Sequence, residues 1–140
     1  GPGGPPNPEA QAKTAIEARQ SVFRLLNNQN APIGGMNRPN AAAPDLAVVA
    51  RNAARMQMLA DMIPELFTTN TTAVTTVKTR ALPGIWAGAA DFKAKAEALS
   101  KAAGAVATAA KSGDAAATKA AAGEIGKACG ACHDTYRGPA

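Results

Sequence analysis

Ligating and aromatic side chains are scarce in this 140-residue chain, which contains two cysteines, one histidine, one tryptophan and one tyrosine. A structural zinc site uses four Cys or His ligands, so the composition disfavours one. The chain has no stretch of about 20 uninterrupted apolar residues, and we expect no membrane-spanning helix. Its net charge of +5 comes from scattered basic residues without interleaved aromatics. We therefore expect no nucleic-acid binding, whereas an anionic protein partner stays open.

The chain opens with GPGGPPNPE, which has neither the charged start nor the apolar run of a signal peptide. This pattern indicates a mature terminus or a cloning scar. We expect residues 1–7 to form a disordered Pro/Gly-rich arm and residues 8–140 to form one domain.

Alanine dominates the composition, and only five residues are aromatic. Because alanine has the highest helix propensity, the sequence predicts an all-α fold. A core built from such small side chains has little apolar volume. A bulky cofactor would fill it.

Four helical segments are expected, each with inward-facing residues three and four positions apart. The first covers residues 8–28, the second begins near Pro44, the third covers residues 85–110, and the fourth includes residues 125–136. The residues expected to face the core are Ile16, Arg19, Phe23, Leu26, Leu46, Val49, Ala53, Met56, Ala60, Ile63, Phe92, Ala96, Leu99, Ala103, Val106, Ala110, Ile125, Cys129, Cys132 and Tyr136. This repeated spacing predicts an antiparallel four-helix bundle.

The connections between these segments are also visible in the sequence. NNQNAPIGGMNRPNAAAP carries amides, prolines and glycines that are expected to break the first helix. The threonine-rich stretch at 66–84 is expected to be a long connection. KSGD ends the third helix, and Ser112 or Asp114 is expected to cap the fourth.

The sequence IGKACGACHDTYR near the end of the chain places Cys129, Cys132 and His133 in a C-x-x-C-H pattern. Positions three and four apart share one helix face, so both thiols and the imidazole point the same way. Two such thiols add to the two vinyl groups of one haem, and the histidine ligates its iron. A redox dithiol, another metal site and a chance cluster are weaker interpretations. A thioredoxin-like dithiol, for instance, requires a βαβ context.

The chain resembles the cytochrome c′ family of class II c-type cytochromes. The resemblance depends on ARQSVFRLL, APIGGM, LPGIWAGAADFKAKAEAL and IGKACGACHDTYR. It implies an antiparallel four-helix bundle, often a homodimer, that holds one covalently attached haem c. It also implies export to the bacterial periplasm. Polar residues in the first predicted helix, at Lys13, Glu17 and Arg24, weaken the expectation of a homodimer.

The resemblance also implies roles for individual residues. Cys129 and Cys132 match the thioether positions, His133 the iron ligand, and Arg137 the basic residue one turn beyond it. The remaining matches are Arg19 and Gln20 at the haem edge and propionates, Trp86 beside the haem, and Arg80 at a nearby polar position. Arg19 as a plain surface arginine and Trp86 as ordinary core filling are the alternatives.

Phe23 occupies the position where family members with six-coordinate iron, such as the cytochromes c-556, place methionine. Phenylalanine cannot ligate iron, so the resemblance implies a five-coordinate iron covered by Phe23. Arg24, one position further, is expected to point about 100° away. An ordinary core role for Phe23 is the alternative.

Two functional classes follow. One is a haem protein that binds nitric oxide and carbon monoxide, and the other is a His/Met electron-transfer cytochrome with an unknown redox partner. Met36, Met56, Met58 and Met62 are the candidate ligands for the second class, and Met36 lies in a glycine-rich segment that would let it reach the iron. We expect no enzyme, because the chain shows no nucleophile–base arrangement.

Overall fold

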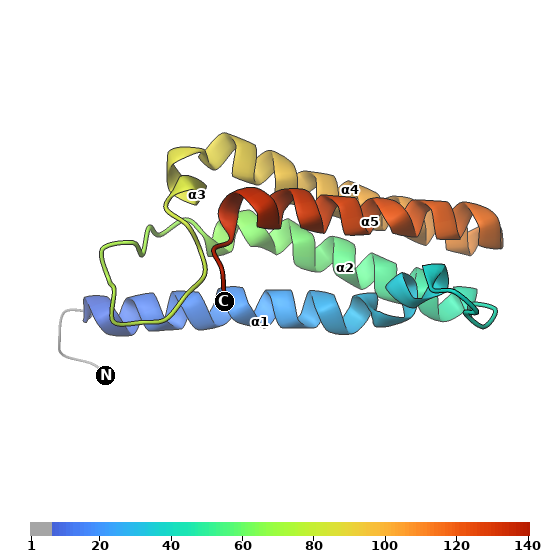
Figure 1. The fold of residues 1–140 in the computed structure, drawn as a ribbon, viewed down its shortest axis with the longest axis horizontal. Helices are drawn as coiled ribbons and strands as arrows, with labels where there is room; N and C mark the ends of the chain where they lie inside the picture. Colours follow the sequence, from blue (N-terminus) through green and yellow to red (C-terminus); the bar gives the residue numbers. More distant parts are fainter. Residues whose placement is uncertain (1–6) are drawn as a thin grey trace.

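The structure is a computed structural model that describes residues 7–140. Four long helices form an up-down-up-down bundle (Figure 1): α1 (Pro8–Gly34), α2 (Leu46–Leu66), α4 (Ala89–Lys111) and α5 (Ala115–Tyr136). Two short helical turns complete the described chain, η1 (Gly35–Asn37) and α3 (Gly84–Ala87). The predicted antiparallel four-helix bundle is confirmed. The predicted arm lies outside the described residues except for Asn7.

Side-chain caps define where three of the long helices begin. Asn7 accepts hydrogen bonds from the backbone N–H groups of Glu9 and Ala10, at 2.9 and 3.4 Å. Asp45 and Asp114 cap α2 and α5 in the same way. The second helix therefore begins at Leu46, two residues after the predicted start near Pro44. Of the two residues predicted to cap the last helix, Ser112 and Asp114, the structure has Asp114 as the cap.

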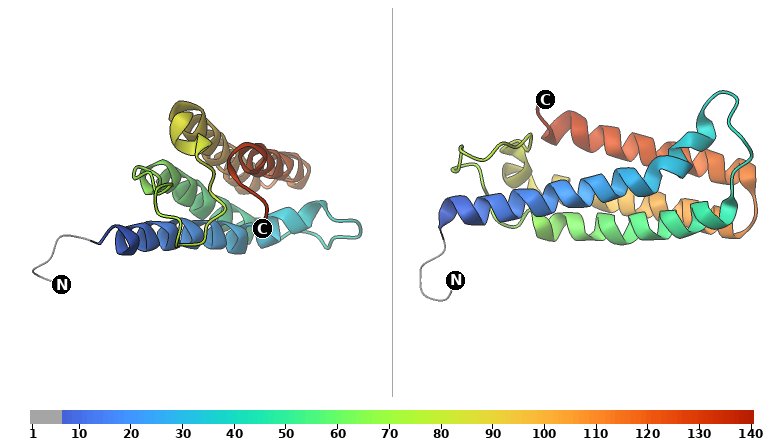
Figure 2. Two further views of the ribbon diagram at one scale, coloured as in Figure 1. Left: turned by 60° about the vertical axis from the view of Figure 1, so that its left-hand side comes forward. Right: turned by 90° about the horizontal axis from the view of Figure 1, so that it is seen from below.

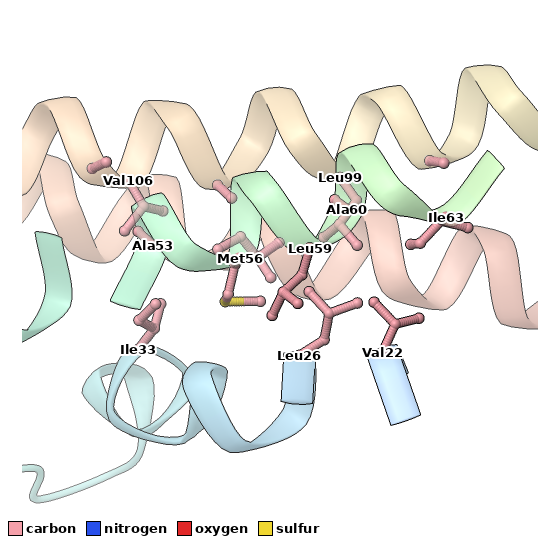
Figure 3. Packing of buried hydrophobic residues seen from close by; sticks show 14 of the residues in the cluster. Val22, Leu26, Ile33, Ala53, Met56, Leu59, Ala60, Ile63, Leu99 and Val106 are labelled. Carbon is pink, nitrogen blue, oxygen red and sulfur yellow. The ribbon is translucent and has the colours of Figure 1, made fainter. Parts of the chain in front are cut away.

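The apolar stripes predicted from the sequence form the core. Figure 3 shows side chains of α1, α2 and α4 converging there, with Met56 near the middle. The predicted core residues are buried except for Phe23, Leu46, Cys129 and Cys132, which are partly buried and pack against the core. None of the helices described for residues 7–140 is both long and apolar enough to cross a membrane.

The structure corrects the predicted end of the first helix. α1 does not stop at Asn28 but continues through Pro32 to Gly34. Burial explains the difference, because Ile33 is fully buried and Asn52 donates a hydrogen bond to the Gln29 carbonyl at 3.1 Å. Since Pro32 lies in the last turn, its missing N–H removes one helical hydrogen bond near the end only.

The predicted third helix is interrupted. Gly88 leaves the helical conformation, with φ −112° and ψ 43°, and separates α3 from α4. A side chain at this position would meet the Gly84 carbonyl oxygen at 3.2 Å and the Tyr136 hydroxyl at 3.4 Å. Glycine therefore allows the end of α5 to pack closely against this break.

The connection at residues 67–83 has no helix, as predicted, and it lies beside the end of α5 (Figure 2). An isolated antiparallel bridge joins Ala81 and Arg137. The Leu82 N–H donates to the Tyr136 carbonyl at 3.0 Å, and the Gly138 N–H donates to the Arg80 carbonyl at 2.7 Å. These bonds fix the chain on both sides of Arg137, directly after the end of α5.

Candidate functional site

A cavity of about 350 Å³ lies between the helices near the end of α5. This volume falls in the range of small-molecule and cofactor sites, which is about 300–1,000 Å³. Eight of the nine residues predicted from the sequence line it: Arg19, Gln20, Phe23, Arg80, Cys129, Cys132, His133 and Arg137. The fold therefore brings together residues that are more than 100 positions apart in the chain.

The two thiols and the imidazole share one wall of the cavity. Cys129, Cys132 and His133 are half-buried on the last turns of α5, and both cysteines are free thiols. Burial raises the pKa of both thiols. Burial, together with the charges of Arg137 and Arg80, lowers the pKa of His133, so its imidazole is neutral at pH 7 and keeps a lone pair.

This set of donors fits a haem better than a bare ion. Two thiols and one neutral imidazole at C-x-x-C-H spacing are the groups that hold haem covalently and ligate its iron. Among residues 7–140, no group of three or more His, Cys, Asp or Glu side chains lies close enough to hold a metal ion.

Phe23 and the buried Ile16 and Leu26 line the cavity from α1. The Phe23 ring packs against Phe67, with ring centroids 6.4 Å apart. These side chains have no lone pair to offer a metal, and they make this part of the lining apolar.

Arg24 also lines the cavity, so the prediction that it points away is wrong. The cavity is wide enough to include neighbouring positions of α1, and Arg24 is an exposed residue at its rim. Asn27, also exposed, lines the cavity one turn further along the helix. The α1 side of the cavity is therefore partly polar.

Arg19 is only 3% exposed, and its guanidinium is directed at the connection. It donates to the carbonyl oxygens of Leu66 and Thr69 at 2.7 and 2.6 Å, and to the Thr71 hydroxyl at 2.9 Å. It also lies 4.6 Å from the centre of the Phe67 ring. No local sequence pattern indicates these partners, and the predicted propionate contact stays a prediction.

Trp86 does not line the cavity. Its indole N–H donates to the Phe67 carbonyl at 2.7 Å, and its ring centroid lies 6.1 Å from that of Phe67. On the other side, Trp86 lines a second, open hollow formed mostly by the threonine-rich connection. It therefore supports the cavity through Phe67, and a direct contact with haem stays a prediction.

Sequence reasoning missed one polar cluster beside the site. The Tyr136 hydroxyl donates a hydrogen bond to Asp91, and Lys95 donates to both oxygens of Asp91 at 3.1 and 2.9 Å. The bond from Tyr136 is the main cause that lowers the pKa of Asp91, and the same bond raises the pKa of Tyr136 to about 12. In the sequence, the spacing of four residues between Asp91 and Lys95 could have indicated this ion pair on one helix face.

The bundle and the paired thiols beside an imidazole define a c-type haem protein of the four-helix-bundle class. A family model described as Cytochrome C′ matches residues 14–137. The chain belongs to the cytochrome c′ family. Family membership assigns haem c to this chain, and the two free thiols that line the cavity are consistent with its covalent attachment.

Three relatives illustrate this membership. Cytochrome c′ of Rubrivivax gelatinosus is 37% identical over 123 residues, which are 88% of this chain and 93% of the relative. Its solved structure has a TM-score of 0.78 at 36% identity and covers 90% of this chain and 96% of that chain. A cytochrome c-554 of Cereibacter sphaeroides is 33% identical over 128 residues, which are 91% of this chain and 82% of the relative. A nitric oxide complex of a cytochrome c prime variant from Alcaligenes xylosoxidans has a TM-score of 0.72 at 29% identity and covers 91% of this chain and 97% of that chain.

Proposed function

We propose that this protein is a periplasmic cytochrome whose haem iron is five-coordinate, and that it binds nitric oxide and carbon monoxide and exchanges electrons with a redox partner. When bound, haem supplies the iron that takes the gas or the electron. His133 supplies the protein ligand. We propose no catalysis of a separate substrate.

The proposal of a five-coordinate iron depends on where the four methionines lie. All four lie within the described residues, and none of them lines the cavity. Met36 is buried in η1, where the neighbouring Asn37 donates to the Lys119 carbonyl at 3.0 Å. Lys119 precedes His133 by fourteen residues, which is about 21 Å along α5. Met36 is therefore poorly placed to ligate the iron.

The other three methionines do not favour a His/Met iron either. Met56 is 1% exposed in the core between the helices (Figure 3). Met58 and Met62 are exposed on α2, at 61% and 36%. Phe23, at the position where six-coordinate family members place methionine, lines the cavity from α1 and has no lone pair to offer the iron.

The lining supports a preference among gases. Bound dioxygen carries partial negative charge and needs a hydrogen-bond donor, whereas nitric oxide and carbon monoxide depend on one far less. Phe23, Ile16 and Leu26 supply apolar surface, whereas the polar Arg24 and Asn27 are exposed residues at the rim and Gln20 is half-buried. We expect the ferrous protein to bind nitric oxide, to bind carbon monoxide weakly and to form no stable dioxygen complex. A relative in this family has been solved as a nitric oxide complex.

Two further features belong to this proposal. Periplasmic export is supported by the family alone. A homodimer is supported by exposed apolar side chains on the first two long helices, Leu25 on α1 and Met58 and Met62 on α2. Light scattering of the holoprotein should report twice the chain mass, and Met58→Asp should lower it.

Optical spectroscopy of the holoprotein tests the coordination of the iron. The wild-type protein should show the bands of high-spin, five-coordinate iron in both oxidation states. Phe23→Met should convert much of the iron to low spin by supplying a thioether, whereas Phe23→Leu, the matched control, should leave it high spin. A wild-type spectrum that is already low spin would contradict the proposal.

Carbon monoxide kinetics test the position of Phe23. Phe23→Ala should open the site and speed carbon monoxide binding, because the ring no longer covers it. If neither the rate nor the spectrum changes, Phe23 is an ordinary core residue.

A further inference from the structure

We propose that the rim of the haem cavity is a docking surface for an electron-transfer protein with an acidic face. This inference rests on the electron-transfer part of the proposed function and adds the chemistry of the partner. It is carried by the distribution of charge around the cavity.

The formally charged side chains that line the cavity are all positive. Five cationic side chains line it: Arg19, Arg24, Arg80, Lys95 and Arg137. Among residues 7–140, no aspartate or glutamate lines it. The two propionates of a bound haem offset only part of this charge.

Three of these cations face solvent. Arg24, Arg80 and Arg137 are exposed, and they come from α1, the connection and the end of α5. The ion pairs described for residues 7–140 are Lys93–Glu97, Lys95–Asp91 and Lys127–Glu124, so none of them uses an arginine of the rim. These three arginines therefore form a rim of positive charge that is available to a partner.

Two carboxylates, Asp91 and Asp134, act electrostatically on Cys132 and His133, and they do not cancel this rim. Asp91 is already held by Lys95 and by the Tyr136 hydroxyl. Asp134, the residue after His133 on α5, is exposed, and its negative charge opposes the lowering of the His133 pKa. Asp91, Asp134 and the two propionates of a bound haem carry four negative charges. Four of the five cations that line the cavity would balance them, and one arginine of the rim would remain unbalanced.

Charge of one sign around a cavity mouth steers and orients partners of the opposite sign. The effect is local, because the Debye length is about 8 Å at physiological ionic strength. A negative protein surface would thus be drawn to the rim, next to the cavity that would hold the haem. A basic or neutral redox protein would gain no such orientation.

The test uses small redox reagents of opposite charge with the ferrous holoprotein. Stopped-flow oxidation by hexacyanoferrate(III), a trianion, should slow as ionic strength rises. Oxidation by tris(phenanthroline)cobalt(III), a trication, should speed up over the same range. The opposite dependences of the two oxidation rates on ionic strength report the sign of the charge at the site of electron exchange.

Variants of Arg24 locate that charge, because no hydrogen bond or ion pair of its side chain is found among residues 7–140. For a trivalent anion about 12 Å away at low ionic strength, Arg24→Gln should slow oxidation by about threefold and Arg24→Glu by about tenfold. Both effects should vanish at about 0.5 M salt. The matched control is Lys111→Glu, at the far end of α4 and about 27 Å from His133 along the bundle, which should change the rate by less than about 1.5-fold.

Poly-L-glutamate distinguishes an acidic protein surface from small anions. At low ionic strength it should slow hexacyanoferrate oxidation of the wild-type and Lys111→Glu proteins, and slow Arg24→Glu much less. If poly-L-glutamate has no effect, the rim attracts small ions only and the docking proposal is wrong.

Two other results overturn the proposal, and they are distinguishable. If the protein exchanges electrons but Arg24→Glu behaves like Lys111→Glu, the rim does not guide partners, although electron transfer stands. If neither reagent oxidises the ferrous protein, electron transfer itself fails and the docking surface fails with it. Gas binding, measured separately, would be unaffected by either result.

Discussion

Replacing Arg19 tests how the wall of the cavity is held. The guanidinium donates one hydrogen bond to Leu66, the last residue of α2, and two to the connection, and it packs over the Phe67 ring although Arg19 lies on an apolar stripe of α1. Arg19→Met removes the donors and the charge while keeping much of the apolar volume. We therefore expect the connection to lose its main attachment to the bundle.

The magnitude follows from these contacts. A hydrogen bond contributes about 1 kcal/mol net, and water re-solvates the part-buried carbonyls after the change. Loss of the cation–π contact adds about 1 kcal/mol. Arg19→Met should thus lower the free energy of unfolding by about 4 kcal/mol. Arg19→Lys, which keeps the charge without the planar fork, should lower it by about 2 kcal/mol.

Urea unfolding of the ferric holoprotein, followed by circular dichroism, measures both values. Lys13→Met, an exposed position on the same helix, is the control and should change the free energy by less than about 0.5 kcal/mol. A loss below about 1 kcal/mol for Arg19→Met would refute the reasoning. A shifted reduction potential with unchanged stability would favour the predicted propionate contact instead.

The remaining predictions concern the haem and the cluster at Asp91. Mass spectrometry of denatured protein should show one haem added to the polypeptide, and Cys129→Ala should leave a single thioether; haem that dissociates freely on denaturation would contradict covalent attachment. For Tyr136, the raised pKa means that its stabilisation is present below about pH 10 and is lost towards pH 12. For Asp91, the lowered pKa means that its stabilisation is present above the unfolded-state pKa and is lost as the pH falls through the folded-state value. Urea midpoints across pH should therefore vary less at both extremes in Tyr136→Phe, and an unchanged profile would show that the bond is unimportant.

Much of the fold could be predicted from the sequence because burial follows local periodicity here. The stripes on α2 and α4 are buried where the spacing placed them. The end of α1 could not be predicted in this way, because Asn, Pro and Gly residues disfavour a helix locally. Burial of Ile33 and Met36 outweighs that preference.

The site shows the same division between local and long-range information. Cys129, Cys132 and His133 are close in sequence, so their shared face could be predicted. The partners of Arg19 lie about fifty positions away, and no local pattern encodes a bond to a backbone carbonyl. The position of Arg24 was predicted wrongly. Arg24 follows Phe23 by one residue, which was expected to turn it onto a different face of the helix, but the cavity is wide enough to be lined by both residues.

The scarcity of aromatic residues has a structural explanation. All five lie in one connected cluster of rings at the cavity end of the bundle: Phe23, Phe67, Trp86, Phe92 and Tyr136. Phe67 is its centre, with the Phe92 ring centroid at 4.8 Å and the Arg19 guanidinium at 4.6 Å.

Elsewhere the helices pack through small residues. α2 and α4 approach so closely that a Cβ atom at Gly104 would lie 2.9 Å from the Gln57 side chain. Alanine and glycine thus bring these helices together, whereas large rings frame the cavity at the end that carries His133. Because interiors otherwise pack to the density of organic crystals, a space of about 350 Å³ within the bundle needs a group to fill it, and haem c is the group that this family binds. The alanine-rich composition and the few clustered aromatics are therefore two parts of one arrangement, which closes most of the bundle and leaves room for haem at one end.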